Sequence, residues 1–124
     1  MTTEPSLTLQ ELQTRLKRLL RGLEHPPLAS ATALSEEVGE VAKHLLDHHG
    51  YGKPLATEAL ALELADVLVC VCEIATLHGI DLSGAMDKKL ADLAGRVPKW
   101  KADLGAALDA AWKYPAGPGA RRPD

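Results

Sequence analysis

Apolar residues recur along the chain at the three- and four-residue spacing of amphipathic helices, and no stretch shows the strict alternation of a strand. The first such pattern covers residues 8–23, where Thr8 and Glu11 have the spacing of a capping box. Two further patterns cover residues 28–48 and 57–77, and the last of these is apolar nearly all round. The chain is therefore predicted to belong to the all-α class.

The C-terminal part carries two weaker helical patterns. We predict a fourth helix over residues 81–94, because Gly95 and Pro98 interrupt the pattern that follows. The pattern over residues 102–113 allows a short fifth helix. Together these segments predict a four-helix, bundle-like core in a single domain over residues 1–114.

The last ten residues have a different composition. Residues 115–124 contain three Pro and two Gly, which is typical of a disordered tail. Aromatic residues make up only 3% of the chain, and there is no Phe. Because aromatic side chains bury the most area per residue, such a core is thin for a monomer. This composition favours an oligomer.

Charge and cysteine content narrow the class of protein further. A net charge of −3 argues against a nucleic-acid partner. Carboxylates interrupt the longest apolar stretch, residues 60–77, and argue against a membrane span. Cys70 and Cys72 point roughly 200° apart on a helix and cannot bridge each other. We read them as buried thiols of a cytoplasmic protein without a signal peptide.

Five acidic residues fall within two of the predicted helices: Glu36, Glu37 and Glu40 on the second, and Glu63 and Asp66 on the third. The first three share an arc of roughly 100° on their helix, and the last two project from one face of theirs. The third helix contains no Lys or Arg. Burying its carboxylates is costly unless a cation from elsewhere compensates their charge.

An antiparallel arrangement of the two helices would bring both acidic faces together. Four or five carboxylates in one crevice repel one another, and their oxygen atoms suit Mg²⁺, or Mn²⁺, better than Zn²⁺. We therefore predict a Mg²⁺ site formed by four carboxylates: Glu37, Glu40, Glu63 and Asp66. The alternative for the second helix is a solvated acidic face with Lys43 as an ion-pair partner.

The two acidic segments, SEEVGEVA at 35–42 and LELADVL at 62–68, resemble the signature of the MazG-like all-α nucleotide pyrophosphohydrolases. That superfamily includes the dCTP pyrophosphatases and the dimeric dUTPases, and the resemblance extends from His25 to about Trp100. It implies an oligomeric helical bundle that hydrolyses nucleoside triphosphates to the monophosphate and pyrophosphate. It also implies that the four carboxylates named above bind Mg²⁺.

The resemblance implies roles for further residues. Glu36 and Glu37 would act in catalysis, with Glu36 binding a second metal or orienting the attacking water. Lys89 and Arg96 match basic positions that bind the phosphates. His25 resembles a histidine at the mouth of the nucleotide pocket in the dCTP pyrophosphatases, and its alternative is a solvated loop histidine. The other histidines are read as structural or solvated: His44, His48, His49 and His78.

Three residues depart from the family pattern. Cys70, Leu93 and Val97 each replace a polar or stacking residue of the expected pocket, so the preferred base does not follow from the resemblance. Two alternatives remain open beside the triphosphate hydrolase. One is a relative acting on another nucleotide, such as phosphoribosyl-ATP. The other is a non-catalytic helical module for dimerisation or nucleotide sensing.

Overall fold

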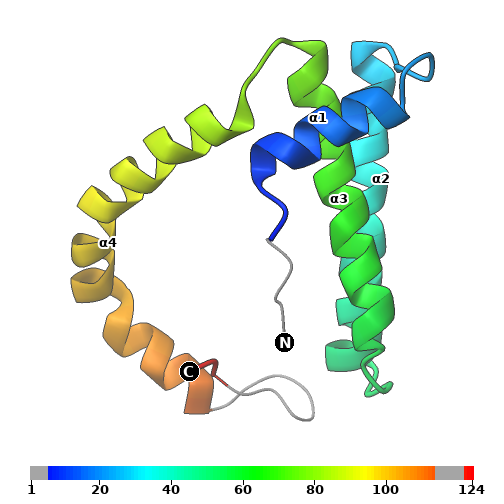
Figure 1. The fold of residues 1–124 in the computed structure, drawn as a ribbon. Helices are drawn as coiled ribbons and strands as arrows, with labels where there is room; N and C mark the ends of the chain where they lie inside the picture. The colour runs from blue at the N-terminus through cyan, green and yellow to red at the C-terminus, as the bar shows by residue number, and fades with distance from the viewer. Residues whose placement is uncertain (1–5, 114–121) are drawn as a thin grey trace, which may run out of the picture.

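The computed structural model describes residues 6–113 and 122–124, and within these ranges it contains helices and loops but no strand. The helices are α1 (Leu9–Leu19), α2 (Pro27–Leu45), the π-helix η1 (Leu46–Gly50), α3 (Thr57–Leu77) and α4 (Leu82–Lys113). Figure 1 shows α2 and α3 side by side, α1 crossing them near one end, and α4 curving away. The predicted all-α class is confirmed.

Helix α1 starts as the capping-box spacing predicts and ends earlier than expected. The Thr8 hydroxyl accepts a hydrogen bond from the Glu11 backbone N–H at 3.1 Å. The helix stops at Leu19, before the predicted end at residue 23. Gly22 has a φ of 88°, which is a left-handed conformation that ends the helical path. The chain then turns towards α2.

Helix α3 is the central helix, because it packs against both α1 and α2. Its bounds agree with the prediction, and Gly79, with a φ of 66°, follows its end. Cys72 and Ala75 on this helix are buried, and Cys70 is half-buried. Both cysteines are free thiols, as the sequence predicted.

Helix α4 contradicts the predicted break between a fourth and a fifth helix. It runs without interruption from Leu82 to Lys113 and contains Pro98 in its interior. A proline removes one backbone hydrogen bond and crowds the preceding turn, which bends a helix without necessarily ending it. Gly95, in that preceding turn, leaves open space around its backbone. The pattern over 102–113 is therefore the continuation of α4 and not a fifth helix.

The N-terminal end of α4 is fixed to α1 by one side chain. The Gln13 amide donates to the Ile80 carbonyl at 2.8 Å and accepts from the Leu82 backbone N–H at 2.9 Å. In the described part of the chain, α4 has no comparable packing against α2 or α3. The four predicted helices are thus present, but in a single chain α4 extends away from the other three (Figure 1).

The single chain buries little apolar surface. Among the described hydrophobic residues only Cys72 and Ala75 are buried. Large exposed side chains lie on α2, α3 and α4, and include Val38, Leu62, Leu64, Leu68, Leu90, Trp100, Leu104 and Leu108. Exposed apolar surface on this scale marks an interaction surface. The sequence-based expectation of a thin core is confirmed for the single chain.

The predicted C-terminal tail is described only in part. Most of the predicted tail, residues 115–124, lies outside the described residues, and the single-domain boundary stays a prediction. Arg122, near the C-terminus, pairs with Asp109 of α4.

No helix in the described ranges is long and apolar enough to span a membrane. The cytoplasmic location stays a prediction.

Candidate metal centre

The pairing of α2 with α3 brings three carboxylates together. One oxygen atom each from Glu37, Glu63 and Asp66 lies within 4.8 Å of the others. Glu37 comes from α2, and the other two come from α3. The two helices run antiparallel (Figure 1), so the predicted meeting of the two acidic faces is confirmed for these three residues.

The rotation of α2 about its axis places Glu37 in this cluster. Leu34, Glu37 and Val41 are half-buried on the side towards α3. By contrast, Val38 and Leu45 are 50% and 39% exposed. Helix α2 therefore carries apolar side chains that the single chain leaves partly uncovered.

The cluster is electrostatically unfavourable for its own carboxylates. Partial burial and the negative charges of its neighbours raise the pKa of Glu37 above its ordinary value; these neighbours are, in decreasing order of effect, Asp66, Glu63, Glu36 and Glu40. Among the described residues, no Lys or Arg forms an ion pair with the three clustered carboxylates. In the described part of the chain, no Lys or Arg side chain thus neutralises the charge of the cluster.

Two predicted residues of the site lie beside the three-carboxylate cluster. Glu36 and Glu40 are exposed and do not belong to the set of mutually close oxygen atoms. Their charges nevertheless act on Glu37. A role for Glu40 as a ligand and for Glu36 in catalysis stays a prediction.

Asp66 differs from the sequence-based expectation in its burial. The apolar neighbours of Glu63 and Asp66 along α3 suggested that both carboxylates are buried. Glu63 is only 25% exposed, but Asp66 is exposed. Leu62, one turn before Asp66 on the same side of α3, is itself 70% exposed, so the single chain leaves this side of the helix uncovered.

The predicted phosphate-binding residues lie apart from the cluster in the single chain. Lys89 and Arg96 belong to α4, which packs on α1. The Arg96 Nε atom pairs with Asp92 of the same helix at 3.2 Å. Neither residue therefore reaches the acidic cluster from its own chain.

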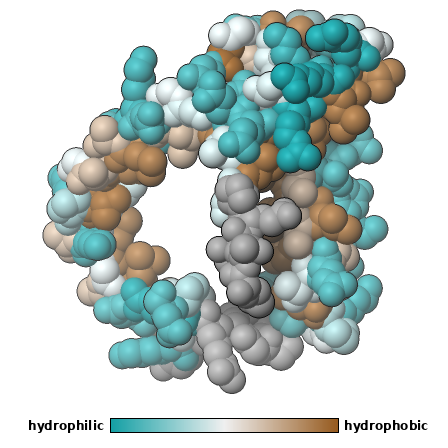
Figure 2. Space-filling model, in the orientation of Figure 1, coloured by the Kyte–Doolittle hydropathy of each residue, from teal (hydrophilic) through white to brown (hydrophobic). Residues whose placement is uncertain are grey.

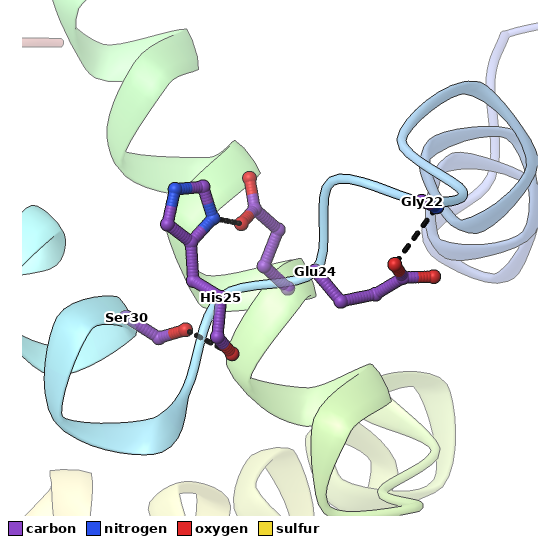
Figure 3. A network of polar contacts seen from close by, with 5 residues as sticks. Gly22, Glu24, His25 and Ser30 are labelled. Carbon is purple, nitrogen blue, oxygen red and sulfur yellow. Dashed lines mark hydrogen bonds and ion pairs between the residues drawn. The ribbon is translucent and has the colours of Figure 1, made fainter.

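His25 lines a small cavity between α1, the α1–α2 loop and α3. Its Nδ1 atom lies 3.8 Å from a carboxylate oxygen of Glu73, and its carbonyl accepts a hydrogen bond from the buried Ser30 hydroxyl at 3.5 Å (Figure 3). The cavity has a volume of about 60 Å³, and Cys72 forms part of its wall. His25 lies at this cavity with 58% of its side chain exposed, and its binding role stays a prediction.

The cavity and the cluster lie along one face of α3. Asp66 and Glu73 are seven residues apart, which is two helical turns or about 10 Å. Cys70 lies between them, and its pKa is raised by burial and then by the charges of Glu73 and Glu37, among others. A thiol with a raised pKa stays protonated, so Cys70 is a poor nucleophile.

Residues 26–100, more than half of the chain, match the MazG nucleotide pyrophosphohydrolase domain. The chain belongs to the MazG family. No curated protein and no solved structure matches it. The matched part of this MazG domain contains the whole three-carboxylate cluster, together with Lys89 and Arg96. His25 lies directly before it.

The MazG family is generally dependent on a divalent metal. The donor set of this MazG domain fits such an ion, because it offers three carboxylate oxygens close together, and no Lys or Arg of the described residues pairs with them. Hard oxygen donors of this kind are the ligands that Mg²⁺ and Mn²⁺ prefer. The residues that would hold the ion are Glu37, Glu63 and Asp66.

One residue near the cluster was missed by the sequence-based reading. His44, which we interpreted as structural or solvated, places its Nε2 atom 3.7 Å from a carboxylate oxygen of Glu63. A signal existed in the sequence, because His44 follows Glu37 by seven residues and Glu40 by four. These spacings place the three side chains on one side of a helix.

Proposed function

We propose that this MazG domain hydrolyses nucleoside triphosphates to the monophosphate and pyrophosphate, with Mg²⁺ held by Glu37, Glu63 and Asp66. The observation that carries the proposal is the three-carboxylate cluster inside the segment that matches the family. Glu40 is proposed as a fourth ligand, because it lies one turn from Glu37 on α2.

We assign separate catalytic roles to the side chains around the cluster. When bound, Mg²⁺ or Mn²⁺ supplies neutralisation of the triphosphate charge and favours ionisation of water. Glu36 is exposed beside the cluster and orients the attacking water. Glu37 accepts its proton through a carboxylate oxygen that is not engaged with the metal, because a positioned carboxylate can act as a general base. Water attacks the α-phosphorus directly, without a covalent intermediate on Cys70.

The cavity beside His25 is proposed to receive the base of the nucleotide. It lies two helical turns from Asp66 on the same face of α3, so one ligand can extend from the cluster to the cavity. His25 and Glu73 supply the polar groups of its rim, and Cys72 and Leu16 supply apolar wall. The preferred base is left to experiment.

A second copy of the chain is proposed to complete the site. Helix α4 carries an apolar stripe that includes Leu90, Trp100 and Leu104, all exposed in the single chain. Figure 2 shows an open space between α4 and the rest of the chain, with hydrophobic side chains bordering it on the α4 side. We propose a homodimer or homotetramer in which α4 of one copy covers the α2–α3 face of another. This arrangement brings Lys89 and Arg96 to the triphosphate.

The reaction is tested by product analysis over a panel of nucleotides. The purified protein is incubated with Mg²⁺ and each of the ribo- and deoxynucleoside triphosphates, or with phosphoribosyl-ATP, in water enriched in ¹⁸O. We expect monophosphate and pyrophosphate, with ¹⁸O in the monophosphate because water attacks the α-phosphorus. Orthophosphate and a diphosphate as products, or no turnover of any triphosphate, would contradict the proposed function.

A further inference from the structure

His44 occupies the side of α2 that faces the metal cluster. Its Nε2 atom lies 3.7 Å from Oε1 of Glu63, across the interface between α2 and α3. The two side chains are 28% and 25% exposed, so the contact is largely shielded from solvent. It is the one contact between the three clustered carboxylates and a potentially cationic side chain that the described residues show.

Glu63 has more freedom than Asp66 to leave the cluster. Its side chain has one more rotatable bond than that of Asp66, and the charges of Glu37 and Asp66 repel it from the cluster. A glutamate under this repulsion would rotate away from the other two carboxylates unless a second group held it. His44 contacts one of its two oxygen atoms from the opposite helix.

We infer that His44 is a positioning residue that keeps the Glu63 carboxylate aimed at the divalent cation, and this inference rests on the proposed function. Groups that orient metal ligands in this way commonly contribute 10- to 100-fold to metal affinity. His44 does not itself bind the ion, because its nitrogen atoms do not belong to the set of mutually close ligand atoms and Mg²⁺ prefers oxygen donors.

The inference is tested by measuring Mn²⁺ affinity through the loss of the free-ion signal in electron paramagnetic resonance. We expect His44→Ala to weaken Mn²⁺ binding by about tenfold or more. His44→Gln should retain most of the affinity, because its side-chain amide can contact the Glu63 carboxylate in place of the imidazole. His78→Ala, an exposed histidine at the end of α3, should bind Mn²⁺ as the unaltered protein does. Circular dichroism in EDTA checks that the variants are folded.

The outcomes separate this inference from the proposed function through a fourth variant, Glu63→Gln. If Glu63→Gln loses Mn²⁺ binding while His44→Ala retains it, the positioning role is overturned and the metal site stands. The bound Mn²⁺ signal could also show nitrogen modulation that disappears in His44→Gln. That result would identify His44 as a direct ligand and would also overturn its positioning role. If Glu63→Gln binds Mn²⁺ unchanged, the proposed metal site fails and the inference fails with it.

Discussion

Replacing Asp66 by Asn is expected to lower kcat/KM for pyrophosphate release by about 10³-fold or more, since a divalent cation contributes several kcal/mol to phosphoryl chemistry and each 1.36 kcal/mol is a factor of ten. The substitution keeps the size of the side chain and removes its charge. Asp66 is exposed and lacks an ion-pair partner in the described residues. The fold should therefore survive, and the loss should reflect the missing ligand.

The matched control is Glu58→Gln. Glu58 is an exposed carboxylate in the first turn of the same helix and lies outside the cluster. We expect it to leave pyrophosphate release within about twofold of the unaltered protein, because surface substitutions away from a site have small effects. Equal losses in both variants, or full activity in Asp66→Asn, would remove the cluster from the mechanism.

Two inactive variants are expected to restore activity when they assemble together. One carries Asp66→Asn, and the other carries Lys89→Gln with Arg96→Gln; the second is expected to lose about 10²-fold or more, as when one charge-stabilising donor is removed. If α4 acts on a neighbouring copy, a mixed oligomer contains one site with an intact cluster and intact cations. Random assortment into two-fold symmetric dimers predicts about a quarter of the unaltered activity for the mixture, and about half for the isolated mixed dimer.

The control for this experiment mixes Asp66→Asn with Glu37→Gln. Both changes damage the α2–α3 part of the site, so every site in the mixed dimer lacks one carboxylate and activity should stay absent. Co-expression with two affinity tags isolates the mixed species, and light scattering gives its mass. A monomeric mass, or a mixed oligomer of the first pair without restored activity, would contradict the proposal that a second copy completes the site.

The sequence predicted best those elements that local signals define. Helix α3 has the predicted bounds because a glycine at residue 79, with its left-handed backbone, ends it. Helix α4 was predicted wrongly as two helices, because Pro98 was read as a stop although it lies inside a continuous helix. A proline weakens a helix by a limited amount, and neighbouring turns can outweigh it.

The site was predicted in part. Glu37, Glu63 and Asp66 come together because the antiparallel pairing follows from a short connection between two helices. The exposure of Val38 and Leu45 could not be predicted, since a sequence does not say how much of an apolar stripe is covered within the chain. His44 was missed although its spacing from Glu37 and Glu40 places it on the same side of α2.

The raised pKa of Glu37 makes the stability of the folded chain depend on pH. Its pKa in the folded chain lies above its ordinary value of 4.5, so the folded state holds this proton more tightly than the unfolded state. As the pH rises from 4.5 towards the higher pKa of Glu37 in the folded chain, the free energy of unfolding falls. Above that pKa the folded chain carries the full destabilisation from the ionised Glu37 carboxylate. Glu37→Gln removes this penalty. In EDTA at neutral pH the variant should therefore unfold at a higher temperature than the unaltered protein, and the difference should disappear below about pH 4.

Thermal unfolding of the unaltered protein and of Glu37→Gln, with and without Mg²⁺, tests the metal centre most directly. An ion present at 100 times its Kd stabilises the folded state by about 2.7 kcal/mol, or roughly 10 °C for a domain of this size. We predict that Mg²⁺ raises the Tm of the unaltered protein by this order and that of Glu37→Gln by much less, so that their order of stability reverses. An equal shift in both proteins, or no shift in either, would contradict a Mg²⁺ site at Glu37, Glu63 and Asp66.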